Sequence, residues 1–148
     1  MSLLNMLYAS KTKNGHHQIQ QDLMDILSEA LNFNLENDIT GVLYYGNGFF
    51  LHYLEGEKDK LEYLYYNFIY KDHRHKECEI LFSSFIELRN FDKWTMKYAP
   101  INVKVKQFFK TQEIPNFNPY LINPLSIPAL IQVIFDDQIR VANNYHSY

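Results

Sequence analysis

The stretch Ile39–Gly56, ITGVLYYGNGFFLHYLEG, predicts a β-hairpin from which the rest of the fold can be worked out. Two runs rich in β-branched and aromatic residues flank the tripeptide Gly46-Asn47-Gly48, and such runs favour strands. Glycine and asparagine readily adopt the positive φ angles that a tight turn between antiparallel strands requires. We therefore expect two paired strands joined at this tripeptide.

The second strand carries one histidine, His52, among apolar and aromatic neighbours. Side chains alternate along a strand, so His52 shares a face with Phe50 and Leu54. If that face is covered, the imidazole must find a hydrogen-bond partner, because buried polar groups almost always have one. Either another core residue or a bound ligand can be that partner.

The segments on either side of the hairpin show strand and helix patterns. Near the N-terminus, Leu4, Met6 and Tyr8 share one face of a predicted strand. Two apolar stripes at helical spacing predict helices, and the stretch Asn32–Asp38 breaks the first pattern. In chain order we expect a strand at Leu3–Ser10, a helix at Gln18–Leu31, the hairpin at Ile39–Glu55, a helix at Lys58–Lys71, a strand at Glu79–Leu88 and a short strand at Trp94–Tyr98.

This order of elements, βαββαββ, matches an α+β, ferredoxin-like fold, in which two helices lie on one face of a mostly antiparallel sheet. The composition changes after Pro100, because all five prolines fall between positions 100 and 128. A helical pattern then runs from about Ile127 to Asn143. We expect residues 1–100 to form the main domain and residues 101–148 to form a C-terminal helical extension packed on it.

Composition limits the classes of function. A chain of 148 residues that is 47% hydrophobic and 21% charged is expected to fold as one globular domain. The net charge of −3 gives no reason to expect direct nucleic-acid binding, which depends on clustered lysine and arginine. The sequence has no apolar segment long enough to span a membrane and has a single cysteine, so we expect a cytoplasmic protein.

Motifs for common enzyme chemistry are missing from the sequence. The five glycines fit neither a P-loop nor a dinucleotide-binding spacing, and Ser83 and Ser84 follow no glycine elbow. The six histidines show no HExxH spacing and have no partner cysteine pair. We therefore expect no metal site and no enzymatic activity. A small ferredoxin-like enzyme stays an alternative to the two functions given at the end of this subsection.

Five short motifs occur in a fixed order along the chain. They are Y-A-S from Tyr8, F-N-x-x-x-D-I-T-G-V-L-Y-Y from Phe33, G-F-F-x-x-x-L-E-G from Gly48, D-x-R-H from Asp72 and R-x-F-x-x-W-x-M from Arg89. Together they resemble the BLUF domain, a flavin-based sensor of blue light, over Leu3–Tyr98. The remaining third resembles the C-terminal helical extension of short, single-domain BLUF proteins.

The resemblance implies a non-covalently bound FAD between the two helices, with its ring system against the sheet. It implies that Tyr8 is the photoactive tyrosine and that Asn34 hydrogen-bonds the pyrimidine edge of the ring. Trp94, on the last strand, matches a residue linked to signal output. The cofactor-binding residues that the resemblance implies are Tyr8, Ile26 as an apolar wall, Asn34, His52, Asp72 and Arg74 near the polar edge of the ring, and Met96 on the last strand.

The sequence departs from the family pattern at three positions. Phe33 replaces a residue that is often polar, and Phe68 stands where many members carry an arginine. His52 stands where the family has its essential glutamine, whose rearrangement between tyrosine and flavin is the light-induced switch, seen as a red-shifted absorption. A neutral imidazole also offers one donor and one acceptor, so it can accept from the Tyr8 hydroxyl and donate to the flavin. It cannot reproduce the rearranged amide, and it adds a pH dependence that glutamine lacks.

These observations predict a blue-light photoreceptor that binds FAD, uses Tyr8 and His52 photochemically and signals through protein contacts with an altered switch residue. The expected partner is a downstream regulatory protein of unknown identity, and a homo-oligomer is compatible with the sequence. The alternative is a degenerate, light-insensitive module that keeps the fold and binds a protein partner. His52 and Phe68 favour the alternative, whereas Tyr8 and Asn34 favour a retained flavin pocket.

Overall fold

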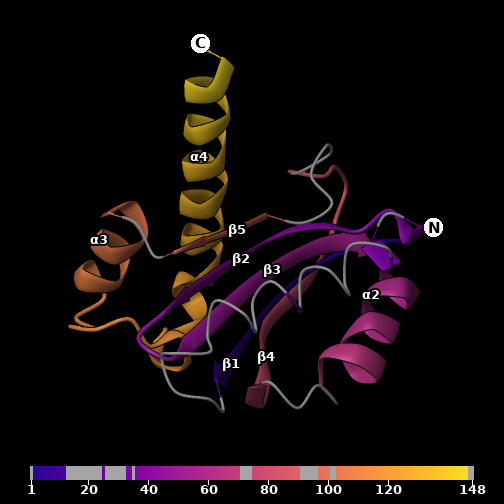
Figure 1. The fold of residues 1–148 in the computed structure, drawn as a ribbon, viewed down its shortest axis with the longest axis horizontal. Helices are drawn as coiled ribbons and strands as arrows, with labels where there is room; N and C mark the ends of the chain where they lie inside the picture. The colour runs from indigo at the N-terminus through magenta and orange to yellow at the C-terminus, as the bar shows by residue number, and fades with distance from the viewer. Residues whose placement is uncertain are drawn as a thin grey trace.

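The computed structural model describes residues 2–12, 25, 33–34, 36–70, 75–90, 97–100 and 103–146. Within those residues, five strands form one sheet in the order β4-β1-β3-β2-β5 (Figure 1). Neighbouring strands are antiparallel except β2 and β5, which are parallel. The strands are β1 (Leu3–Thr12), β2 (Thr40–Gly46), β3 (Phe49–Glu57), β4 (His75–Ile86) and β5 (Lys97–Pro100). The α+β, ferredoxin-like fold class is confirmed.

The predicted hairpin is formed by β2 and β3, and its turn consists of Asn47 and Gly48. Both turn residues have positive φ, 51° and 83°, as this tight turn requires. Because β3 lies between β1 and β2, it is the central strand of the sheet. The predicted face is also confirmed: His52 and Leu54 point to one side of β3, and Tyr53 contributes to the core on the other side.

One face of the sheet is covered by α2 (Lys58–Leu64), which continues into a π-helical turn, η1 (Tyr65–Ile69). This agrees with the predicted helix at Lys58–Lys71. Apolar side chains of β1, β3, α2 and η1 form one core on this face. That core consists of Leu4, Met6, Tyr8, Ile39, Leu54, Leu61, Leu64 and Tyr65.

The other predicted helix, Gln18–Leu31, lies outside the described residues except for Asp25, which is helical. The predicted break at Asn32–Asp38 is wrong, because residues 33, 34, 36 and 37 have helical backbone. The Asn37 side chain donates to the Phe33 carbonyl at 2.8 Å, and the Ile39 amide donates to the Asn34 carbonyl at 3.0 Å. Asp38 ends the segment with φ 55°, the left-handed conformation common after a helix. Asn34 is therefore a helical residue rather than a loop residue.

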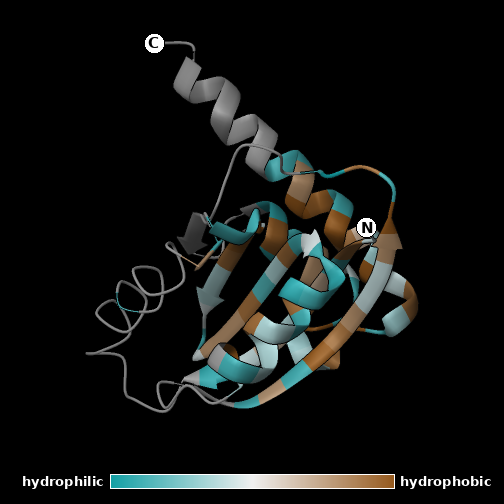
Figure 2. Ribbon diagram, turned by 90° about the vertical axis from the view of Figure 1, so that its right-hand side faces the viewer, coloured by the Kyte–Doolittle hydropathy of each residue, from teal (hydrophilic) through white to brown (hydrophobic). Residues whose placement is uncertain are grey.

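The opposite face of the sheet is covered by α3 (Val103–Thr111) and α4 (Ile127–His146), which are joined by two 3-10 turns, η2 (Pro119–Leu121) and η3 (Pro124–Ser126). Figure 2 shows hydrophobic residues on the strands and along the first half of α4. The helix predicted at about Ile127–Asn143 is confirmed, whereas α3 was not predicted as a separate helix. The buried apolar residues that this segment adds are Val105, Phe109, Ile114, Phe117, Ile122, Ile127, Leu130, Ile131 and Ile134.

A buried hydrogen bond joins α4 to the sheet. The Tyr44 hydroxyl of β2 donates to Asp137 Oδ2 of α4 at 2.9 Å, and both residues are fully buried. Buried carboxylates are rare unless they are hydrogen-bonded. The helix is thus fixed by a polar contact as well as by apolar packing.

Several predicted strand boundaries are wrong: β1 ends at Thr12 instead of Ser10, and β4 ends at Ile86 instead of Leu88. β4 begins at His75 instead of Glu79, because β1 continues to Thr12 and pairs with it. The pairing of β1 with β4 shifts register between Leu7 and Tyr8 and again between Ala9 and Lys11. The last strand, β5 (Lys97–Pro100), pairs with β2 and ends two residues after the predicted end at Tyr98, while the predicted start at Trp94 lies outside the described residues. Residues 91–96 lie outside the described residues.

Candidate functional site

The structure brings Tyr8 and His52 together. They are direct cross-strand partners on β1 and β3, and the Tyr8 hydroxyl lies 2.7 Å from His52 Nδ1, within hydrogen-bond distance. Their rings are 5.0 Å apart between centroids, at 60° to each other. Only 3% of Tyr8 and 2% of His52 is exposed. The imidazole thus has a buried hydrogen-bond partner within the core.

The chemistry of this hydrogen bond depends on the imidazole tautomer. When the phenol donates to Nδ1 of a neutral imidazole, the ring hydrogen is on Nε2. His52 then accepts from Tyr8 through one nitrogen and is a donor through the other. A single side chain can in this way connect the tyrosine to a second acceptor group.

Tyr8 lies at an irregular place in the sheet. The register of β1 against β4 shifts between Leu7 and Tyr8, whereas the pairing of β1 with β3 is regular. Such bulges occur often beside functional sites, where they change the direction of a side chain. The shift lies next to the residue that hydrogen-bonds His52.

Tyr65 of η1 covers Tyr8. The two rings meet edge to face, with 5.4 Å between centroids and 69° between planes, and Tyr65 is only 3% exposed. Burial, with the thiol of Cys78 nearby, raises the pKa of the Tyr65 phenol far above its ordinary value. The Tyr65 phenol therefore keeps its proton at neutral pH.

Asn34 is fully buried. Its neighbour Phe33 packs against the core that contains Tyr8 and stacks on Tyr63, with 5.9 Å between ring centroids. The polar residue implied by the resemblance is thus held on the covered face of the sheet by a helical segment. Of the predicted site residues, the structure describes Tyr8, Asn34 and His52, while Ile26, Asp72, Arg74 and Met96 lie outside the described residues.

A second buried polar group lies on the opposite face of β3. Glu55 is fully buried and accepts hydrogen bonds from the Tyr53 hydroxyl at 2.7 Å and from the Asn90 backbone amide at 2.8 Å. Burial and the Glu55 carboxylate raise the pKa of the Tyr53 phenol far above its ordinary value. This cluster fastens the segment after β4 to the central strand.

Sequence reasoning missed the roles of Tyr65 and Glu55. Tyr65 lies in the apolar stripe that predicts the helix at Lys58–Lys71, and its phenol is the one polar group of that stripe. Glu55 was noted only as part of the LEG motif. The available signal is a carboxylate that follows a mostly apolar and aromatic run, Phe49–Leu54, because such a group is buried only when it has donors.

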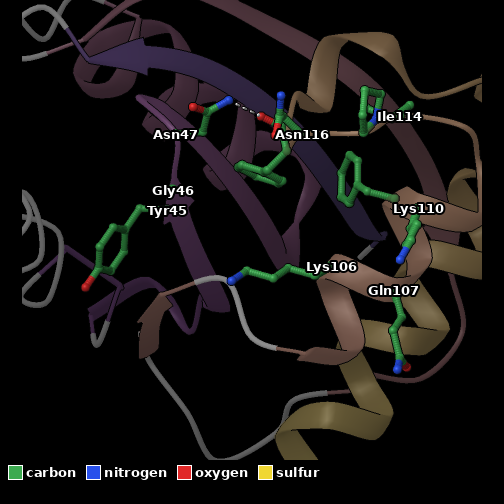
Figure 3. Close-up of a pocket in the computed structure, with 11 residues that line it drawn as sticks. Tyr45, Gly46, Asn47, Lys106, Gln107, Lys110, Ile114 and Asn116 are labelled. Atoms are coloured by element: carbon green, nitrogen blue, oxygen red, sulfur yellow. Dashed lines mark hydrogen bonds between the residues drawn. The ribbon is translucent and has the colours of Figure 1, made fainter.

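A cavity of about 780 Å³ lies elsewhere, between the tip of the β2–β3 hairpin and α3 (Figure 3). Phe109 and Phe117 line it together with Lys106 and Lys110 of α3, while Asn47 from the hairpin donates to the Phe117 carbonyl at 3.2 Å. Neither member of the Tyr8–His52 pair lines this cavity.

The described residues contain no group of three or more His, Cys, Asp or Glu side chains placed to hold a metal ion. Across the same part of the chain, no helix is long and apolar enough to cross a membrane.

Comparison with protein families matches residues 3–97 to the BLUF model, described as sensors of blue light using FAD. The chain is 30% identical over 101 residues to the photoactivated adenylate cyclase subunit beta of Euglena longa, and 30% identical over 96 residues to that of Euglena gracilis. These segments cover 68% and 65% of this chain but only 12% and 11% of those proteins. The chain thus spans a small part of these curated relatives.

Among solved structures, BlsA in its ground state is similar at a TM-score of 0.83 and 35% identity, over 90% of this chain and 87% of that chain. The photo-activated state of BlsA gives 0.82 and 35%, over 90% and 94%. The dark state of BlrB, a BLUF protein, gives 0.74 at 23% identity, over 92% and 97%, which is a likeness of fold alone.

Proposed function

The chain belongs to the BLUF family of sensors of blue light using FAD, and we propose that it is a blue-light photoreceptor domain that binds FAD non-covalently. The observation that carries the proposal is the buried hydrogen bond of 2.7 Å between Tyr8 and His52 on the face of the sheet covered by α2. A phenol joined to a group with a second hydrogen-bonding atom is what a light-driven proton and electron donor requires.

The described residues fit the edge of a flavin ring. Such an edge presents carbonyl oxygens and ring nitrogens, and the Asn34 carboxamide and the His52 imidazole each combine a donor with an acceptor. Tyr8, Asn34 and His52, the described residues that would meet it, are buried, and apolar side chains of the same core surround Tyr8. Ile26, Asp72, Arg74 and Met96 would complete the binding site.

FAD, when bound, would supply a blue-light chromophore whose excited state is a one-electron oxidant, and Tyr8 is the residue placed to donate that electron. A phenol that loses an electron becomes a strong acid, so Tyr8 passes its proton to His52 Nδ1 across the short hydrogen bond. His52 then carries the positive charge and holds the proton close to the Tyr8 oxygen. When the electron returns, the proton returns with it and restores the starting pair.

His52 changes the hydrogen-bond pattern that the site can adopt after the light step. A glutamine amide can rotate or tautomerise and so exchange its donor with its acceptor, whereas an imidazole can exchange them only by moving a proton between two fixed nitrogens. We infer that the light-adapted hydrogen-bond pattern differs from that of a glutamine-containing BLUF domain. The output is then a change of protein contacts with an altered spectral signature.

The visible spectrum of the purified protein, in the dark and after blue light, tests this function. We expect a yellow protein with bound FAD and a reversible light-dependent change. Colourless protein that takes up no added FAD would contradict flavin binding.

His52 also favours a second candidate, a light-insensitive interaction module with the BLUF fold. A yellow protein without any reversible change after light would support this module and contradict the photoreceptor. The two candidates share the fold and differ only in the response of the Tyr8–His52 pair.

We further propose that the chain acts in the cytoplasm as a sensor rather than an enzyme and contacts a downstream regulatory protein or a second copy of itself. Size-exclusion chromatography in the dark and under blue light would detect a second copy as a change in apparent mass.

A further inference from the structure

Aromatic rings form a connected series from Tyr8 to the protein surface. Tyr65 meets Tyr8 edge to face at 5.4 Å between centroids. Tyr66 meets Tyr65 at 5.0 Å and 89°, and Tyr70 meets Tyr65 at 6.2 Å and 49°. Every step joins rings that are close enough for rapid electron exchange between them.

Exposure rises along this series. Tyr8 and Tyr65 are each 3% exposed, whereas Tyr66 is 53% and Tyr70 is 60% exposed. The inner two phenols are thus shielded from solvent, and the outer two can release a proton directly to water.

The π-helical turn η1 explains the contact between Tyr65 and Tyr70. The Tyr70 amide donates to the Tyr65 carbonyl at 2.7 Å, a bond between residues five apart. In an α-helix residues three or four apart lie on the same face, so a wider turn is needed to bring residues five apart together. Single π-helical turns of this kind are found mostly at functional positions.

We propose that Tyr65 is a second electron donor, which reduces oxidised Tyr8 and is in turn reduced by Tyr66 or Tyr70. The proposal rests on the function proposed above, because excited flavin is the oxidant. Electron transfer from Tyr65 gives the Tyr8 radical a route of decay that competes with return of the electron from the flavin to Tyr8.

The electrons and protons balance as follows. Tyr8 loses an electron to the excited flavin and its phenolic proton to His52. An electron from Tyr66 or Tyr70 then reaches Tyr8 through Tyr65, and His52 returns the proton to the Tyr8 oxygen. The exposed phenol gives its own proton to water, so the net products are one neutral tyrosyl radical at the surface, one proton in solution and one electron on the flavin.

Energetics favour transfer toward the surface. Tyr65 is only 3% exposed, so its phenol cannot pass a proton directly to water when the ring is oxidised, and it is poorly suited to hold the radical. Tyr66 and Tyr70 can lose their protons to water. The buried ring therefore connects the two ends of the series.

The experiment uses the FAD-loaded protein under argon with ferricyanide, a one-electron acceptor that reoxidises the flavin. Under blue light, surface tyrosyl radicals of two molecules couple through a carbon–carbon bond between their rings and rearomatise as dityrosine. We expect light-dependent dityrosine fluorescence from the wild-type protein and its loss in Tyr65→Phe at equal bound FAD. Phenylalanine keeps the ring but cannot donate an electron at this potential.

Tyr63→Phe is the matched control. Tyr63 is 53% exposed, as Tyr66 is, but its ring stacks on Phe33 and not on a tyrosine of the series. It should form as much dityrosine as the wild type. The double variant Tyr66→Phe/Tyr70→Phe should lose dityrosine and retain a tyrosyl signal by electron paramagnetic resonance in frozen, illuminated samples.

Equal dityrosine in Tyr65→Phe and wild type overturns the inference, as does a wild-type flavin that responds to light without any tyrosyl radical at the surface. Both outcomes leave the proposed photoreceptor intact. Protein that takes up no FAD contradicts the proposed function, and the inference with it.

Discussion

At the residue scale, the chemistry depends on the side chain that faces Tyr8. His52 lies directly opposite Tyr8 and hydrogen-bonds it through Nδ1. Nδ1 and Nε2 are held in one rigid ring with diverging hydrogen-bond directions, so the imidazole connects two groups in a fixed geometry. The amide of a glutamine has both functions on one terminal carbon and can rotate them. The two residues can therefore support similar resting states and different states after light.

His52→Gln is expected to produce the reversible red-shifted absorption of the family after blue light. The reason is that the amide restores a donor and an acceptor that can exchange places. The measurement is the absorption spectrum of the FAD-loaded variant before and after illumination.

His52→Asn is the control, because the same amide on a shorter side chain does not reach the Tyr8 hydroxyl in the same way. Adding Tyr8→Phe to the glutamine variant should remove the response. FAD binding without a red shift in His52→Gln would show that His52 is not the main departure from the family.

At the element scale, β3 carries different groups on its two faces. His52 lies on the face covered by α2, and Glu55 lies on the other face, where it holds the Asn90 amide. Arg89 adds a hydrogen bond from its guanidinium to the Glu55 carbonyl at 3.2 Å. The central strand is thus tied to the beginning of the segment that connects β4 to β5.

Glu55→Leu is expected to lower the free energy of unfolding by about 1–3 kcal/mol, because the buried Tyr53 hydroxyl loses its acceptor, with a smaller loss from the backbone amide of the exposed Asn90. Urea denaturation measures the loss, and hydrogen exchange at the Asn90 amide reports it locally. Glu57→Leu is the control, because Glu57 forms only a partly exposed pair with Lys60 at 3.8 Å, worth about 0–1 kcal/mol. Equal losses in the two variants would contradict the role given to Glu55.

The elements that the sequence predicted well have local patterns. The turn at Asn47 and Gly48, the stripe of α2 and the start of α4 at Ile127 all follow from short-range spacing and backbone preference. Period two also predicted which face of β3 carries His52. That Tyr8 is its hydrogen-bond partner depends on β1 pairing with β3 in one register, and no local pattern of β1 contains that register.

The features that could not be predicted depend on contacts between distant segments. β4 begins at His75 because β1 extends to Thr12 and pairs across a register shift. The helical state of Asn34 depends on a cap at Asp38, whose positive φ is only weakly signalled by its residue type. The ring contact between Tyr65 and Tyr8 needs the position of α2 above the sheet.

At the scale of the whole molecule, the sheet separates two cores. The core with Tyr8 lies under α2, and the core with Phe109 and Ile134 lies under α3 and α4. Side chains from both faces of β3 belong to these cores, Tyr53 to one and Leu54 to the other. A displacement of this strand at His52 therefore reaches both cores. The division of the chain at residues 100 and 101 stays a prediction.

Tyr44→Phe is expected to lower the free energy of unfolding by about 1–3 kcal/mol, because it removes a donor from the buried carboxylate of Asp137. Asp137→Ala should cost a similar amount, and the double variant should cost less than the sum of the two, since the residues interact directly. Asp136→Ala is the matched control: it is the next residue of α4, is exposed and accepts only from Gln132 of the same helix at 3.0 Å among the contacts described. It should change stability by no more than about 0.5 kcal/mol. Additive losses at residues 44 and 137 in urea denaturation would show that the hydrogen bond does not couple α4 to the sheet.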